Sequence, residues 1–238
     1  MIWLQFILFF IFVYLLILVL RVLYAIYIVR SVLKKTIPFT KFVGLNNNYC
    51  AVIGDSLALG IGIKDNRYTV SGRLSKDFPN FNIETYSKKG LRLNHLNYYS
   101  RILTTIFIRQ KYKLIIFIVG ANDIIKFSSY WNIEYYLNEV IRKFKERAEH
   151  IIILHGGNVG ESPLFLPPLN WIYDKRTYKL RDIYKRTAGN YNNVYYIDLL
   201  NIKYSKEFFA RDFLHANEKG VEFAYERISQ TIRDKKIF

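Results

Sequence analysis

The chain has 238 residues, enough for one ordinary globular domain and a short additional element but not for two large domains. Hydrophobic residues make up 51% and charged residues 23% of the sequence, a balance that excludes a disordered chain, and the formal net charge is +16. The single cysteine, Cys50, excludes an internal disulfide, and the four histidines are too widely spaced to form a paired metal site.

The first predicted element is a transmembrane helix in residues 1–29. Residues 1–20 carry no charge, and a helix of that length spans about 30 Å, the thickness of a bilayer hydrocarbon core. Arg21 interrupts the run, but its long side chain can reach the headgroups. A buried core helix is the alternative, although such helices carry a polar stripe that is missing here. A cleaved signal peptide is disfavoured because the run is too long and no small-x-small site follows it.

Basic residues predict the orientation of this helix. Lys or Arg occurs at no position before the run and at five positions shortly after it: Arg21, Arg30, Lys34, Lys35 and Lys41. The positive-inside rule then places the C-terminal side in the cytoplasm, with the chain in the inner membrane. The opposite, periplasmic orientation stays open, because a single N-terminal segment can also act as an ordinary signal anchor.

Residues 30–48 are predicted to form a basic juxtamembrane linker, because Pro38 and Gly44 break any periodicity. Strands and helices then alternate through a domain covering 49–238. The predicted strands are 49–53, 81–86, 113–119, 150–155 and 194–199, and the predicted helices are 66–77, 91–109, 132–148, 170–188 and 216–233. The strands are apolar throughout, as in sheets covered on both faces. This order predicts a three-layer α/β/α sandwich with a mostly parallel, five-stranded, flavodoxin-like sheet.

Polar residues follow several of these strands. In open parallel sheets, sites form beyond the carboxyl ends of the strands. The first strand is followed by GDSL (54–57), the second by SKKG (87–90) and the third by GAND (120–123), while DFLHAN (212–217) precedes the last helix. Each is by itself an ordinary turn or cap sequence. Together they supply a nucleophile, oxyanion donors, a base and an acid that orients the base.

This ordered set resembles the Gly-Asp-Ser-Leu family of serine esterases, also called SGNH hydrolases, over about residues 49–232. The resemblance implies a catalytic triad of Ser56, Asp212 and His215. It also implies an oxyanion hole made by the backbone N–H groups of Ser56 and Gly90 and the side-chain amide of Asn122. A transmembrane anchor followed by basic residues resembles a membrane-anchored bacterial branch of that family.

Two features depart from the family pattern. Ala216 stands after the histidine, where the family usually has proline. Lys88, Lys89 and Arg92 surround Gly90, where the family usually has small and hydroxyl residues, so the predicted oxyanion hole is more basic.

The predicted function is that of a membrane-anchored serine hydrolase that cleaves carboxylic esters through an acyl-enzyme, without cofactor or metal. Acyl esters, lysophospholipids and O-acetyl esters are candidate substrates, and the bilayer is a partner through residues 1–29. The lipase-type Gly-x-Ser-x-Gly elbow is absent, which disfavours an ordinary α/β-hydrolase. Residues 163–171 are interpreted either as an acyl-pocket wall or bilayer-touching flap, or as simple loop packing.

Two other classes of function compete. A catalytically silent, membrane-associated binding module would keep the fold, but the intact set of five residues argues against it. The charge of +16 suggests a nucleic-acid binder. The basic membrane flank and a composition rich in residues with AT-rich codons account for that charge, and no clustered basic-aromatic motif occurs, so no nucleic-acid partner is expected.

Overall fold

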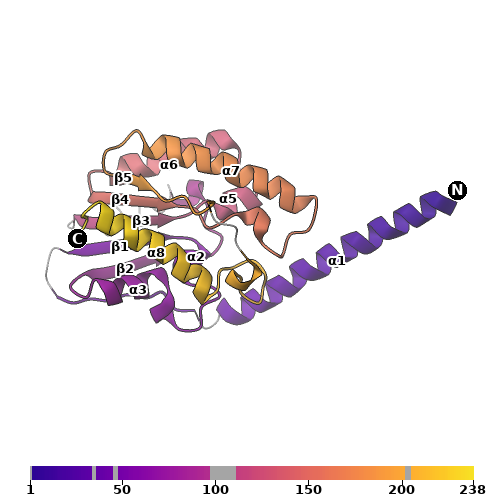
Figure 1. Ribbon diagram of the computed structural model, residues 1–238, viewed down its shortest axis with the longest axis horizontal. Coiled ribbons are helices and arrows are strands. Elements are labelled where there is room, and N and C mark those ends of the chain that lie inside the picture. Colours follow the sequence, from indigo (N-terminus) through magenta and orange to yellow (C-terminus); the bar gives the residue numbers. More distant parts are fainter. Residues whose placement is uncertain (1, 34–35, 45–47, 97–110, 202–204) are drawn as a thin grey trace.

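The computed structural model describes residues 2–33, 36–44, 48–96, 111–201 and 205–238, and consists of a long N-terminal helix and one three-layer domain (Figure 1). Its five strands form a wholly parallel sheet in the order β2-β1-β3-β4-β5. The strands are β1 (Tyr49–Gly54), β2 (Asn82–Ser87), β3 (Tyr112–Ile118), β4 (Ala148–Leu154) and β5 (Val194–Tyr196). The predicted five-stranded parallel sheet is therefore confirmed.

Helices alternate with the strands along the chain. They are α1 (Ile2–Leu33), α2 (Ser56–Leu59), α3 (Val70–Asp77), α5 (Ala121–Ile125), α6 (Tyr130–Phe144), α7 (Leu169–Ala188) and α8 (Glu218–Asp234). Short 3₁₀ turns occur at Asn66–Tyr68, Val159–Glu161 and Lys206–Phe208. Of the helix predicted at 91–109, residues 93–96 are helical and residues 97–109 lie outside the described residues.

Helices cover both faces of the sheet, which explains why the strands are apolar throughout. Cys50 and Val52 of β1 belong to a core shared with α3 and α8, whereas Ala51 and Ile53 belong to a core shared with α6 and α7. Successive strand residues point to opposite faces, so both sets of side chains are buried. The three layers follow directly from this pattern.

The strand order creates a topological switch point between β1 and β3. From β1 the chain passes to β2 on one side, while β3 pairs with β1 on the other. Parallel sheets bind ligands at the carboxyl ends of the strands where the order reverses in this way. Gly54 ends β1 there, and a Cβ on it would lie 2.2 Å from the carbonyl oxygen of Ile118. Only glycine permits this close approach of the two strand ends.

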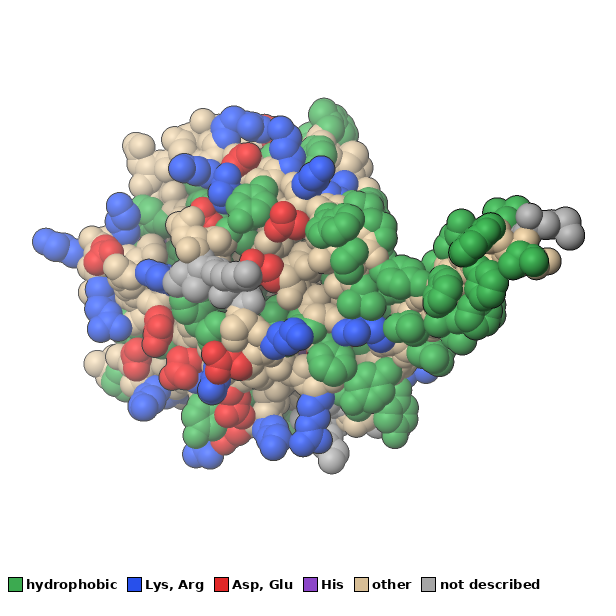
Figure 2. Space-filling model, turned by 45° about the vertical axis from the view of Figure 1, so that its right-hand side comes forward, with side chains coloured by type: hydrophobic (Ala, Val, Ile, Leu, Met, Phe, Trp, Pro, Cys, Tyr) green, Lys and Arg blue, Asp and Glu red, His purple; other side chains and the backbone are tan. Residues whose placement is uncertain are grey.

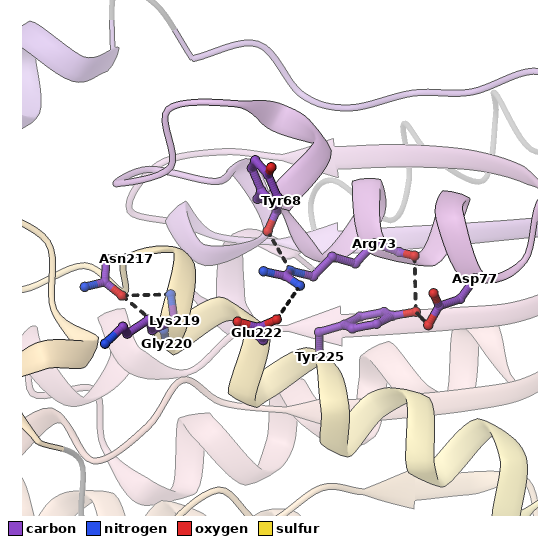
Figure 3. Close-up of polar contacts among 8 residues, drawn as sticks. All are labelled: Tyr68, Arg73, Asp77, Asn217, Lys219, Gly220, Glu222 and Tyr225. Atoms are coloured by element: carbon purple, nitrogen blue, oxygen red, sulfur yellow. Dashed lines mark hydrogen bonds and ion pairs between the residues drawn. The ribbon is translucent and has the colours of Figure 1, made fainter.

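Hydrogen bonds between α8 and the segment around α3 fix the start of α8 (Figure 3). The Arg73 guanidinium pairs with the Glu222 carboxylate at 3.1 Å, and the Tyr225 hydroxyl donates to Asp77 at 2.7 Å. Arg73 also donates to the carbonyl of Tyr68 at 3.2 Å. Because α8 begins three residues after His215, these contacts help to hold the position of that histidine.

Residues 36–44 lie along the outer edge of β2. Lys41 and Ile83 exchange two backbone hydrogen bonds, at 2.9 and 2.8 Å, in an antiparallel bridge. The Asn82 side chain accepts from the N–H of Val43 and donates to the carbonyl of Gly44. These contacts satisfy backbone groups that an open edge strand would expose.

Helix α1 projects from the domain, on the side opposite the C-terminus (Figure 1). Its segment Ile2–Ser31 is long and apolar enough to cross a membrane, and the most apolar stretch is 0% buried. A soluble core helix of this composition would be buried. The structure therefore contradicts the alternative of a core helix and leaves a candidate membrane span.

Candidate active site

Ser56 is the first residue of α2, directly beyond the carboxyl end of β1. Asp55 caps this helix, because its Oδ1 accepts the N–H of Leu57 at 3.0 Å. Gly60 ends the helix in a left-handed conformation, with φ of +84°. The sequence GDSL thus forms a tight strand-to-helix turn that presents the Ser56 hydroxyl at the edge of the sheet.

Asp212 and His215 form a hydrogen-bonded pair in the loop before α8. Asp212 Oδ2 lies 2.6 Å from His215 Nδ1, and Asp212 Oδ1 accepts the backbone N–H groups of Leu214 and His215 at 3.0 and 2.9 Å. Burial raises the pKa of Asp212, but the hydrogen bonds and charge of His215 outweigh burial and bring that pKa below its usual value. The carboxylate is therefore ionised at neutral pH. An ionised acceptor at this distance favours the tautomer with the proton on Nδ1, which leaves Nε2 free to act as a base.

A pocket of about 110 Å³ brings several of the predicted residues together. Ser56, Asn122 and His215 all line it, although they come from the ends of β1 and β3 and from the loop before α8. Asp212 lies behind His215 and is not part of the lining. Residues 163–171 do not line it either. Leu164 is buried and Phe165 packs against the core, so this segment is not the wall of the described pocket.

Asn122 lies in the first turn of α5, and its Nδ2 donates to Asp55 Oδ2 at 3.2 Å. Burial raises the pKa of Asp55 to about 6, against the opposing effects of the Leu57 N–H, the His215 charge and the Asn122 amide. A primary amide has two N–H groups. One of those on Asn122 is bound by Asp55, which leaves the other available to the pocket.

Asp123 and Gly90, from two of the motifs found in the sequence, are not among the residues that line this pocket. Asp123 accepts the N–H of Leu93 at 3.0 Å and the hydroxyl of Ser128 at 2.9 Å, so its carboxylate braces the neighbouring turns. Gly90 has φ of +71° in the turn after β2, and no atom of the described residues lies within 4 Å of where its Cβ would be.

His155, which was not predicted from the sequence, lies directly before two glycines that line the pocket. Burial lowers the pKa of His155 to about 4, so its ring is neutral. Nε2 lies 2.9 Å from the Tyr196 hydroxyl, and Nδ1 lies 2.5 Å from the carbonyl of Gly156. Gly156 and Gly157 line the pocket. The sequence offered one signal for this position, a histidine directly after β4 that is followed by two glycines. That local pattern does not by itself indicate the wall of a pocket.

This geometry defines a class of protein. A serine and a side-chain amide beyond the carboxyl ends of two parallel strands share one pocket with a histidine that is paired with an aspartate, and these are the groups that a serine hydrolase needs. The sequence matches the GDSL-like Lipase/Acylhydrolase family over residues 52–223. The chain belongs to that family.

Solved structures support the assignment at the level of fold. The TesA crystal structure superposes with a TM-score of 0.62 at 15% identity, over 80% of this chain and 100% of that chain. A lipolytic G-D-S-L family protein from Veillonella parvula gives a TM-score of 0.63 at 16% identity, over 78% of this chain and 98% of that one. An acetyl xylan esterase from Geobacillus stearothermophilus gives 0.57 at 16% identity, over 78% and 94%. Comparison of the sequence with curated proteins gave no match.

Proposed function

We propose that this protein is a membrane-anchored serine hydrolase that cleaves carboxylic esters. The observation that carries the proposal is the 2.6 Å contact between Asp212 Oδ2 and His215 Nδ1, made by a histidine that lines the same pocket as Ser56. An oriented imidazole next to a serine at a helix N-terminus is the arrangement that activates a hydroxyl nucleophile.

In the proposed mechanism, the Ser56 hydroxyl attacks the ester carbonyl while His215 Nε2 takes its proton. Asp212 holds the imidazole by Nδ1 and stabilises the imidazolium that forms. The tetrahedral intermediate collapses when His215 returns the proton to the leaving alcohol, which leaves an acyl group on Ser56. Water activated by His215 then attacks this acyl-enzyme and releases the acid.

Three donors are proposed for the oxyanion: the backbone N–H groups of Ser56 and Gly90, and the second N–H of the Asn122 amide. Asp55 supports the third donor, since its Oδ2 accepts the first N–H of Asn122 at 3.2 Å and so orients the amide. Such donors act on charge that develops in the transition state, and each contributes about 10²–10³ in rate.

The proposed location is the inner membrane, with α1 as the anchor and the domain on the cytoplasmic side. The length, composition and exposure of α1 support the anchor. The five basic residues after the apolar run support the orientation. The proposed substrate class is an acyl ester, a lysophospholipid or an O-acetyl ester. Proteins similar in fold include an acetyl xylan esterase and a lipase.

A fluorophosphonate probe tests the nucleophile. The probe should label Ser56, and Ser56→Ala should abolish both labelling and turnover of p-nitrophenyl esters. Ser162→Ala is the matched control, because Ser162 lines the same pocket but its hydroxyl donates to the carbonyl of Phe213. This control should still be labelled. Labelling that persists in Ser56→Ala would overturn the assignment, and a screen over acyl lengths with the wild type identifies the preferred acyl group.

A further inference from the structure

One side of α1 lies against the hydrolase domain. The Tyr14 hydroxyl donates to the carbonyl of Pro167, and the Arg21 guanidinium donates to the carbonyl of Pro163. Ala25, one turn further along, is only 5% exposed. These helix positions are separated by seven and four residues and therefore share one face. Helix α1 thus packs along the loop that precedes α7.

This contact reaches the wall of the active-site pocket. The Arg21 guanidinium lies 5.7 Å from the centroid of the Phe213 ring, and the Tyr24 ring lies 6.1 Å from it. The carbonyl of Phe213 accepts the hydroxyl of Ser162 at 2.6 Å. Ser162 and Leu214 line the pocket, so the helix contacts lie within one residue of its lining.

The charge pattern of α1 sets the depth of these contacts in a bilayer. Arg21 is the first charge after the apolar run, so the headgroup boundary lies near it. Tyr14 precedes Arg21 by seven residues, which places it about 10 Å deeper along the helix. The carbonyl of Pro167, which accepts the Tyr14 hydroxyl, lies at that depth as well.

The loop of residues 163–169 is suited to a position at the surface of the bilayer. Residues 163–169 (PLFLPPL) carry no charge, and three of the seven are prolines, which have no backbone N–H. The N–H of Leu164 donates to the carbonyl of Phe213 at 3.1 Å. The N–H of Phe165 donates to the carbonyl of Ser162 at 3.1 Å. Unsatisfied backbone groups are costly in hydrocarbon, so a loop with few free donors enters it at low cost.

Exposed apolar side chains continue from the helix onto the domain. Trp171 is 61% exposed, Ile172 40% and Phe213 40%. Figure 2 shows that hydrophobic side chains cover the domain surface where α1 joins it. Tryptophan is enriched at the level of the headgroups in membrane proteins. Exposed residues of this kind beside a membrane anchor fit a lipid surface.

We infer that the exposed residues of this segment, Pro167, Pro168, Trp171 and Ile172, enter the bilayer surface with Phe213 beside α1, so that the active-site pocket opens at the headgroup level and receives its ester from a membrane lipid. The inference rests on the proposed membrane anchor and names the substrate class of the same site. The occupant of the apolar surface is the lipid bilayer.

Tryptophan quenching tests this placement in the full chain, reconstituted in phosphatidylcholine and phosphatidylglycerol vesicles with bromine at shallow or deep acyl positions. The three tryptophans, Trp3, Trp131 and Trp171, allow single-tryptophan variants by Trp→Phe substitution. One variant keeps Trp171 and a second keeps Trp3. A third carries Phe238→Trp alone, because the C-terminus lies on the side of the domain away from α1 (Figure 1). Near-UV circular dichroism verifies that each variant is folded.

The expected result is quenching of Trp171 by lipid brominated at shallow positions, quenching of Trp3, and no quenching of the tryptophan at 238. Quenching of Trp3 without quenching of Trp171 would overturn the inference, because the domain would then stand clear of the bilayer. A Trp171 that is shielded from aqueous iodide yet unquenched by bromolipid would also overturn it, in favour of a second copy of the chain on this surface.

Absence of quenching at Trp3 would overturn both the anchor and the inference. None of these measurements depends on ester hydrolysis. A failure here is therefore distinguishable from a failure of the proposed serine chemistry, which the fluorophosphonate experiment reports separately.

Discussion

Asn122 Nδ2 donates a hydrogen bond to Asp55 Oδ2 at 3.2 Å, across the ends of β3 and β1. The other oxygen of Asp55 accepts the N–H of Leu57 at 3.0 Å and so caps the helix that begins with Ser56. One buried carboxylate therefore couples the turn of the proposed nucleophile to the proposed oxyanion donor. Both hydrogen bonds are strongest when Asp55 is ionised, yet burial raises its pKa to about 6.

Asp55→Asn should increase stability at high pH. Folding raises the pKa of Asp55 from 3.8 to about 6, so the folded state binds this proton more tightly than the unfolded state. The stability contributed by the protonated group is fully present below about pH 4 and is lost as pH rises through 6, in total about 3 kcal/mol. Each hydrogen bond of Asp55 that the substitution removes subtracts about 1 kcal/mol from the gain in unfolding free energy at high pH. Urea unfolding of wild type and variant from pH 4 to pH 8 measures the difference.

The same substitution should lower kcat, because the neutral side chain orients Asn122 less firmly. Asp65→Asn is the control, since Asp65 is a surface residue paired with Arg67, away from the described pocket lining. If Asp55→Asn keeps the wild-type dependence of stability on pH between 4 and 6, another group is responsible for that dependence.

Asn122→Ala should lower kcat by about 10²–10³-fold and leave KM nearly unchanged, because the amide acts on charge present only in the transition state. Asn138→Ala provides the control, since Asn138 lies on α6, donates to the carbonyl of Glu134 one turn earlier and does not line the described pocket. Steady-state kinetics on a p-nitrophenyl ester give the comparison. A kcat near the wild-type value in Asn122→Ala would show that a different group binds the oxyanion.

Much of the fold could be predicted because it depends on local pattern. Continuous apolar runs such as 113–119 form buried strands, and the alternation with helices leaves few arrangements other than a parallel three-layer sheet. The positions of Ser56 and Asn122 follow from the same rule, since both come directly after strands that meet at one edge. For residues within helices and strands, the hydrophobic pattern of the sequence was sufficient to predict their place in the fold.

The remaining parts depend on contacts that no local pattern encodes. Arg21 was interpreted as a charge reaching the headgroups, whereas its guanidinium also donates to Pro163 and lies over Phe213, both more than 140 positions away. Gly156 and Phe208, which line the pocket, belong to a loop and to a short 3₁₀ turn, and neither has a hydrophobic periodicity that a sequence pattern reveals. Gly90 shows the same limit of local sequence patterns. Its place in the turn after β2 could be predicted from the sequence, but its absence from the pocket lining could not.

Gly62→Ala should destabilise the domain more than Gly90→Ala. Both glycines have positive φ, +97° and +71°, so an alanine costs about 1–2 kcal/mol at either position. A Cβ at Gly62 would also lie 2.6 Å from the carbonyl of Ala216, whereas a Cβ at Gly90 would meet no atom within 4 Å in the part of the chain that the structure describes. The steric conflict adds about 1–3 kcal/mol and displaces the residue next to His215, so kcat should fall too. Equal unfolding free energies for the two variants would show that the loop at Ala216 yields without cost.

The last prediction concerns the side of the membrane on which the domain lies. A C-terminal green fluorescent protein fusion should fluoresce in a bacterial host, and the matching alkaline phosphatase fusion should be inactive, because the five basic residues from Arg21 to Lys41 favour the cytoplasm. Near an anionic leaflet each such residue contributes roughly 1 kcal/mol of electrostatic attraction to the membrane surface. Replacing Arg30, Lys34 and Lys35 with Gln and adding three lysines before the apolar run should reverse both readouts. Arg21 and Lys41 stay unchanged in this test because their side chains hydrogen-bond to the domain. Phosphatase activity in the unmodified fusion would instead place the domain outside the inner membrane, where O-acyl groups of the cell envelope become the accessible esters.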